Sequence, residues 1–242
     1  IGQSRIGGIP DLPPDVDWPC NEEEPLSFVA QINLAEIASF DAASELPRSG
    51  HLLFFNDAEQ RVWGFDPADA KGFRVIHYSG SDLRRSAYPD QFGPEGRFEP
   101  CELKFGQGIS LPPDESATIA SLNLSEKQLD VYMDVREEFR TEEQFANQSI
   151  LLGCPDQIQG DMQLECALVT NGLYLGDLSG YEDPRADALR QDAGSWRLLL
   201  QVASEDDAKM MWGDVGCLYF WIHESDLRAG ALDRVWMILQ CS

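Results

Sequence analysis

Apolar residues along the chain fall into short runs whose length and spacing predict more strands than helices. These runs predict strands over 26–33, 51–55, 61–65 and 73–78 in the first half, and over 196–202 and 216–222 in the second. The polar stretch 56–60 is typical of a hairpin loop that joins 51–55 to 61–65. Strands that follow one another through short loops pair antiparallel, so the pattern predicts antiparallel sheet.

Helical spacing is clearest in the middle of the chain. Ser125 and Gln128 match a capping box, and Leu129, Tyr132 and Phe139 lie on one face of the following segment. This pattern predicts a helix over 126–147. Shorter helices are predicted over 34–40, over 161–172 and after Pro184. A strand over 167–169 is the open alternative within the second of these segments.

One apolar pattern that contains a single glutamine occurs twice. The first copy comprises 8–10, 28–32 with Gln31, and 50–55, and the second comprises 153–155, 198–202 with Gln201, and 216–221. Element order repeats while loop lengths differ, which is typical of a duplicated unit. We therefore predict an α+β fold of predominantly antiparallel β-sheet, with two pseudo-repeated β-rich halves and a few helices. The chain is predicted to be one domain over 1–242, with halves at about 1–120 and 150–242 joined by the helix near 126–147.

Several segments combine into one recognisable signature. They are GGIPDLPP at 7–14, PLSFVAQINL at 25–34, and further matches within 46–55, 153–159, 196–201 and 212–220. Together they resemble the YwqG-like family, a bacterial family of domains of unknown function, over nearly the whole chain. Cys154 stands where an aromatic residue is common in that family. Because the family has no established activity, the resemblance implies an α+β fold and no mechanism.

The charge balance narrows the choice of partner. The chain has 18 basic and 42 acidic residues, a formal net charge of −24, and the excess is spread over both halves. Such a surface repels phosphate backbones, so nucleic-acid binding is disfavoured, whereas a basic protein or divalent cations would be attracted. Solubility, including adaptation to salt, is the alternative explanation of this acidity.

Cysteine usage and apolar run length bear on location. None of the six cysteines forms a C-x-x-C pair, which excludes a compact zinc knuckle. Reduced core thiols and a cytoplasmic location are predicted, although six cysteines allow 15 disulfide pairings. No apolar run approaches the roughly 20 residues of a transmembrane helix. The chain begins at Ile1 without a signal-peptide pattern, and a missing N-terminal segment is an open alternative.

Candidate chemistry is sparse. The three histidines lie in or beside predicted strands, and neither Gly-x-Ser-x-Gly nor a phosphate-binding glycine pattern occurs, so no catalytic residue and no cofactor are assigned. The two glutamines are predicted to satisfy backbone groups at strand ends, with a pocket between the halves as the alternative. The ligand-binding candidates are Gln31, Gln201, Trp212 and Asp214, and the metal candidates are Asp206, Asp207 and Asp214.

These observations favour a non-enzymatic acidic protein-interaction module that binds a basic partner, for example a toxin or nuclease. The alternative is a hydrolase or small-ligand-binding protein with a site at the junction of the halves, using carboxylates such as Asp214 together with His223. A structural scaffold is a third hypothesis. No nucleic-acid or membrane partner is expected, and the sequence does not specify the oligomeric state.

Overall fold

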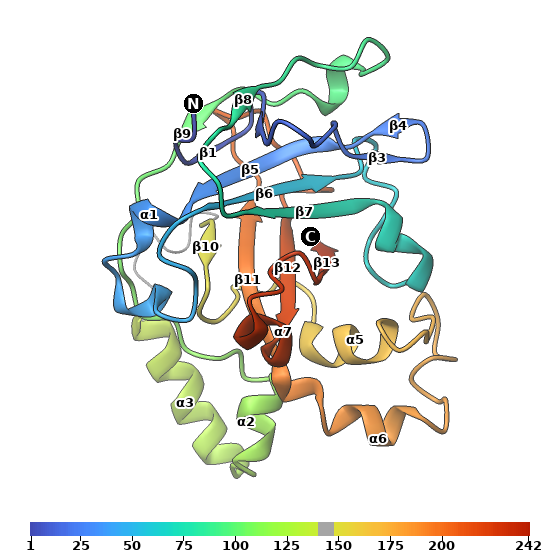
Figure 1. Cartoon of the computed structure of the whole chain (residues 1–242). Helices are drawn as coiled ribbons and strands as arrows, with labels where there is room; N and C mark the ends of the chain where they lie inside the picture. The colour runs from blue at the N-terminus through green and yellow to red at the C-terminus, as the bar shows by residue number, and fades with distance from the viewer. Residues whose placement is uncertain (140–147) are drawn as a thin grey trace.

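Two antiparallel sheets face each other across one apolar core in the computed structural model, which describes residues 1–139 and 148–242 (Figure 1). The first sheet has the strand order β7-β6-β5-β1-β9. Its strands are β1 (Arg5–Ile6), β5 (Ser27–Asn33), β6 (His51–Asn56), β7 (Phe73–Tyr78) and β9 (Cys101–Glu102).

The second sheet has the order β10-β11-β12-β13, and its strands cross those of the first in Figure 1. They are β10 (Ile150–Leu151), β11 (Trp196–Ala203), β12 (Cys217–His223) and β13 (Val235–Gln240). Two short ribbons flank the first sheet, and they pair β2 (Asp11–Leu12) with β8 (Arg84–Arg85) and β3 (Cys20–Asn21) with β4 (Glu24–Pro25).

Helices gather beside the second sheet in Figure 1, apart from α1 (Leu34–Ile37), which follows β5 directly. The others are α2 (Ala117–Ser121), α3 (Glu126–Phe139), α5 (Met162–Val169), α6 (Ala186–Arg190) and α7 (Glu224–Ala229). Side chains cap the starts of several of them. Asp161, for example, accepts a hydrogen bond from the Gln163 amide at the N-cap of α5, 3.0 Å. Within the described residues, every helix is too short or too polar to cross a bilayer.

The core explains why the central strands are continuously apolar. Phe54 of β6 meets Phe220 of β12 with ring centroids 5.0 Å apart, and Phe73 of β7 meets Trp236 of β13 at 5.3 Å. A second, smaller apolar cluster covers the other face of the first sheet, where Phe28 and Phe55 cluster with Leu12 and Trp18 from the N-terminal part of the chain. Strands buried on both faces lose the polar alternation of a half-exposed sheet.

Most predicted elements are confirmed, and so is the α+β antiparallel fold class. The strand predicted over 61–65 is wrong, because its backbone groups bond elsewhere. The Arg61 amide donates to Asp57, 2.8 Å, the Gly64 amide donates to Asp69, 2.8 Å, and β7 takes the expected place beside β6. The alternative strand over 167–169 is also wrong, since those residues are helical in α5. For the helix predicted over 126–147, α3 confirms the first part, and 140–147 lie outside the described residues.

The two sheets share several local features. Each central strand has a register irregularity two residues before its glutamine, between Phe28 and Ala30 in β5 and between Leu198 and Leu200 in β11. In both sheets a short two-residue strand pairs with that glutamine. These shared features support the predicted pseudo-repeat, and the duplication itself stays a prediction.

Candidate functional site

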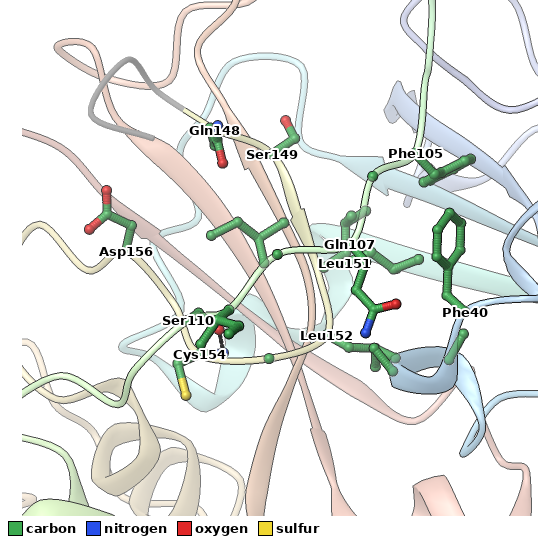
Figure 2. A pocket seen from close by; sticks show the side chains of 18 of the residues that line it. Phe40, Phe105, Gln107, Ser110, Gln148, Ser149, Leu151, Leu152, Cys154 and Asp156 are labelled. Atoms are coloured by element: carbon green, nitrogen blue, oxygen red, sulfur yellow. Dashed lines mark hydrogen bonds between the residues drawn. The ribbon is translucent and has the colours of Figure 1, made fainter. Parts of the chain in front are cut away.

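One hollow in the described part of the chain lies beside β10, where the seam between the two sheets opens to the surface (Figure 2). We call it the β10 groove. It encloses about 290 Å³, the lower end of the range for small-ligand sites. The segments 103–111 and 148–156 form its two long walls. Residues of β5, α1, α3 and β11, together with Phe40, Ala42 and Ala43, complete it.

The groove is apolar on one side and polar on the other. In Figure 2 the rings of Phe40 and Phe105 lie on one side, and the carboxylate of Asp156 lies on the other. Two basic side chains, Lys104 and Arg136, also line it. Arg136 lies 3.7 Å from Asp114, whereas Lys104 makes no ion pair within the described residues. The groove lining therefore carries two basic side chains and one carboxylate, unlike the chain as a whole, in which acidic residues predominate.

Cys154 is the only thiol lining the described groove wall, and it is not poised for catalysis. The Cys154 backbone amide donates a hydrogen bond to the Ser110 hydroxyl oxygen at 2.9 Å. Burial raises the pKa of the Cys154 thiol, so the neutral thiol predominates at neutral pH. Since the thiolate is the reactive species, this cysteine is a poor nucleophile.

Gln201 holds the wall that contains Asp156. Its Oε1 accepts from the Asp156 amide, 2.9 Å, and its Nε2 donates to the Gln148 carbonyl, 2.9 Å. The Tyr219 hydroxyl donates to the Asp156 carbonyl at 2.7 Å. Buried side chains of β11 and β12 thus satisfy a segment that has no regular secondary structure, as buried backbone groups require.

Gln31 plays the same part in the first sheet. Its Oε1 accepts from the Asp11 amide, 3.0 Å, and its Nε2 donates to the Gln3 carbonyl, 3.0 Å. The dipeptide Gln-Ser precedes both short strands, at 3–4 before β1 and at 148–149 before β10. The aspartate whose amide bonds to the glutamine, Asp11 or Asp156, lies six residues after Arg5 or Ile150 respectively. The structural interpretation of both glutamines is therefore supported by matching hydrogen bonds.

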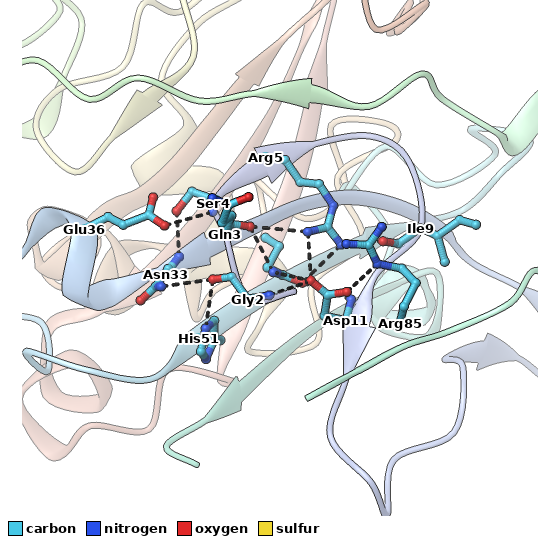
Figure 3. Close-up of polar contacts among 11 residues, drawn as sticks. Gly2, Gln3, Ser4, Arg5, Ile9, Asp11, Asn33, Glu36, His51 and Arg85 are labelled. Carbon is cyan, nitrogen blue, oxygen red and sulfur yellow. Dashed lines mark hydrogen bonds and ion pairs between the residues drawn. The ribbon is translucent and has the colours of Figure 1, made fainter. Parts of the chain in front are cut away.

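The surroundings of Asp11 in the first sheet differ from those of Asp156 in the second. Asp11 is fully buried and binds two guanidinium groups, those of Arg5 at 2.9 Å and of Arg85 (Figure 3). Burial acts to raise the Asp11 pKa, but hydrogen bonds from Arg85, the Gly2 amide, Arg5 and Gln31 outweigh it and hold that pKa well below its usual value. In the second sheet an apolar residue, Ile150, stands at the position of Arg5.

The outer edges of the short strands differ as well. β1 pairs on one side with β5 and on the other with β9, and the Leu103 amide donates to the Ser4 carbonyl at 3.4 Å. Within the described residues, β10 is hydrogen-bonded to β11 alone. The groove lies where the second sheet would have its counterpart of β9.

A second surface feature adjoins the groove. Helix α3 has no buried residue, and Val131, Met133, Val135 and Phe139 are between 38% and 56% exposed. Its sequence, EKQLDVYMDVREEF, contains five acidic and two basic residues. Only a narrow stripe faces the body of the protein, where the Tyr132 hydroxyl donates to the Pro112 carbonyl, 2.6 Å. We call the remaining exposed face of this helix, which carries Val131, Met133 and Val135, the α3 surface.

The remaining sequence candidates do not assemble into a site. Trp212 is fully buried against Phe98, with ring centroids 5.2 Å apart, and neither it nor Asp214 lines the groove. Of the described residues, no group of three or more His, Cys, Asp or Glu side chains is placed to hold a metal ion. The structure therefore does not gather the carboxylates predicted as metal ligands, Asp206, Asp207 and Asp214, into such a group.

The histidines have local roles. His223 caps α7, where its Nδ1 lies 2.7 Å from the Ser225 hydroxyl and accepts from the Ser225 amide at 3.3 Å, while its Nε2 lies 3.2 Å from Asp192. The contacts among Ser225, His223 and Asp192 resemble a Ser-His-Asp catalytic triad. However, Asp192 is 54% exposed, and Ser225 belongs to the helix cap itself. His51 is buried and contacts the Gly2 carbonyl, 3.1 Å. Asp214, whose carbonyl accepts from the Ser242 amide, is not part of this cap.

Sequence reasoning missed the groove. Its apolar walls come from segments that are irregular, so no periodicity marks them. One usable signal existed, because Gln148-Ser149 repeats Gln3-Ser4 and extends the predicted repeat to the strand beside the groove. Ile150 in place of Arg5 then marks the point at which the two halves diverge.

The fold and the groove together define a two-sheet antiparallel α+β protein with an open seam. The chain belongs to the family described as "Domain of unknown function (DUF1963)", whose match covers residues 4–241. None of the curated proteins compared with it matches the sequence. The narrower resemblance to the YwqG-like family stays a prediction.

Proposed function

We propose that the protein is a non-enzymatic acidic interaction module that binds a basic protein partner through the α3 surface. The observation that carries the proposal is a helix with five acidic residues, exposed apolar side chains and no buried residue. A helix of this kind gains little from its own fold, because most helix stability in proteins comes from packing one apolar face. A partner that covers Val131 and Val135 would supply that packing.

The distribution of charge supports a basic partner. Many arginines are engaged in ion pairs within the chain, such as Arg61 with Asp57 at 3.0 Å and Arg228 with Glu224 at 2.8 Å. The formal net charge of −24 therefore resides largely in acidic groups at the surface. Complementary charge speeds association and favours one class of partner over another. The predicted cytoplasmic location belongs to the same proposal and is supported by six unpaired cysteines.

A display library of random peptides, selected against the intact chain, tests this function. Enriched peptides should be rich in Lys and Arg with apolar residues at helical spacing, and their affinity should fall as salt rises. The double variant Val131→Ser/Val135→Ser should lower that affinity by about thirtyfold, since each substitution loses roughly 1 kcal/mol of apolar burial. The matched control Leu178→Ser, at a residue 69% exposed, should bind as the unmodified chain does. Enrichment of acidic peptides, or binding that ignores both salt and the double variant, would contradict the proposal.

A small-ligand-binding protein is the second candidate, and the β10 groove favours it. An apolar cavity of about 290 Å³ with Lys104 and Arg136 at its walls would suit a compact apolar molecule that carries an acidic group. Native mass spectrometry of protein purified from its own cells would detect a retained molecule. A Gln107→Trp variant, which fills the groove from an exposed wall residue, should lose it, whereas Gln191→Trp on an exposed helix end should keep it.

A further inference from the structure

The β10 groove corresponds to a strand position that is filled in the first sheet. β9 occupies the outer side of β1, with Glu102 opposite Arg5 and Cys101 opposite Ile6. β10 takes the place of β1 in the second sheet, because Ile150 pairs with Gln201 as Arg5 pairs with Gln31. The side of β10 that β9 would cover by this correspondence opens into the groove.

Backbone contacts fix this correspondence closely. The Gly7 amide donates to the Val29 carbonyl at 2.9 Å, and the Leu152 amide donates to the Leu199 carbonyl at 3.1 Å. Gly7 and Leu152 also share a left-handed backbone, with φ of 63° and 62°. A leucine rarely adopts that conformation without a constraint, so the turn after β10 is held in the same geometry as the turn after β1.

The hydroxyl groups that precede the two strands repeat the match. The Asn33 amide donates to the Ser4 Oγ at 2.8 Å, and the Ala203 amide donates to the Ser149 Oγ at 3.3 Å. Ser149 therefore stands where Ser4 stands, and the Ser4 carbonyl is the group that accepts from Leu103 beside β9.

The direction of the hydrogen bonds follows from this geometry. Bonding directions alternate along an antiparallel strand, and the Leu152 amide points to β11. The amide and carbonyl of Leu151 and the carbonyl of Ser149 consequently face the groove. An edge of this kind is a template for one more strand.

We propose that the β10 groove binds an extended segment of a partner protein, which adds to the second sheet as a fifth strand antiparallel to β10. Its alternate side chains are apolar and enter the seam beside Phe40 and Phe105. Those between them are acidic and lie near Lys104 and Arg136. This inference is independent of the proposal for the α3 surface. It rests on the edge of a sheet and on basic side chains, whereas that proposal rests on acidic ones.

The probe is the blocked peptide acetyl-Val-Glu-Leu-Glu-Val-amide, titrated into the intact chain and followed by amide NMR shifts. Binding should perturb the Ser149 and Leu151 amides and should saturate. N-methylation of each peptide amide in turn should weaken affinity at every second position, by about fivefold to tenfold for each lost hydrogen bond, and should leave the intervening positions near the original value. Equal effects at all positions, or no saturable binding, would overturn the inference.

Two protein variants complete the test. Leu151→Pro removes the groove-facing amide and should weaken the peptide to the same degree as the most sensitive N-methyl group. Gln107→Trp fills the groove without altering the core and should abolish binding, whereas Gln191→Trp should not. Peptide affinity unchanged in Gln107→Trp would exclude the groove as the site. Selection of basic peptides at the α3 surface is scored separately, so either proposal can fail alone.

Discussion

Glu165 makes the stability of this protein depend on pH in a direction that can be worked out. It lies in α5, half-buried, with the Tyr181 hydroxyl donating to its Oε1 at 3.4 Å and its Oε2 buried without a hydrogen-bond partner within the described residues. Burial, with a further contribution from Asp161, raises the pKa of Glu165 from its ordinary 4.5 to about 7. The native carboxyl therefore keeps its proton in a pH range where the unfolded chain has lost it.

The sign of the effect follows from proton binding. Between about pH 4.5 and 7 the native state holds more protons than the unfolded state, so the free energy of unfolding falls as pH rises, and above that window the full penalty applies. A difference of about 2.5 in pKa corresponds to roughly 3 kcal/mol at 1.36 kcal/mol for each unit. Most of that, about 2 to 3 kcal/mol, is lost between about pH 5 and pH 8.

Urea unfolding of the unmodified chain and of Glu165→Gln at both pH values measures the effect. Gln has the same shape and does not titrate, so other titrating groups cancel in the comparison. The advantage of Glu165→Gln over the unmodified chain should grow by about 2 to 3 kcal/mol from about pH 5 to pH 8. A difference that stays constant with pH would show that the Glu165 carboxyl is ionised throughout, and would refute the argument.

Two further predictions concern the backbone. Gln201→Leu orphans the Asp156 amide and the Gln148 carbonyl, and should lower the free energy of unfolding by about 2 to 4 kcal/mol in urea titrations; a change below about 1 kcal/mol would mean that water replaces the side chain. Gly64→Ala should cost about 2 to 4 kcal/mol, because φ is 87° and a Cβ would lie 2.2 Å from the Met237 carbonyl oxygen. Gly172→Ala, with φ of 84° and open space around it, is the matched control and should cost only about 1 to 2 kcal/mol; equal losses would remove the steric part of the argument.

Strands buried on both faces were the most predictable part of the fold. The runs within β5, β11 and β12 have lengths and bounding residues that identify a strand without knowledge of its neighbours. Gln31 and Gln201 were predictable for a similar reason, since a buried amide side chain needs partners and strand ends provide them. Their backbone partners could not be read from the sequence, because they lie 20 to 53 residues away.

The error over 61–65 shows where local reasoning fails. Its apolar residues and the preceding polar stretch resemble a hairpin, but Asp57 takes the Arg61 amide and the Leu239 amide of β13 reaches the Trp63 carbonyl at 3.1 Å. A contact across more than 170 positions in the sequence therefore decides the structure of this segment. Local propensity is overridden where such distant hydrogen bonds satisfy the backbone.

Two otherwise matching strands, β1 and β10, differ at one side chain, Arg5 against Ile150, and at their outer edges. Arg5 completes a buried polar cluster with Asp11, and β9 then covers the outer edge of β1. Ile150 stands at the position of Arg5 beside β11, and in the described residues no β9 counterpart covers β10. The backbone around the two strands is similar, so within the described residues they differ in their side chains and in the course of the chain beside them. The same hydrogen-bonding plan thus closes one sheet and leaves the other able to accept a strand.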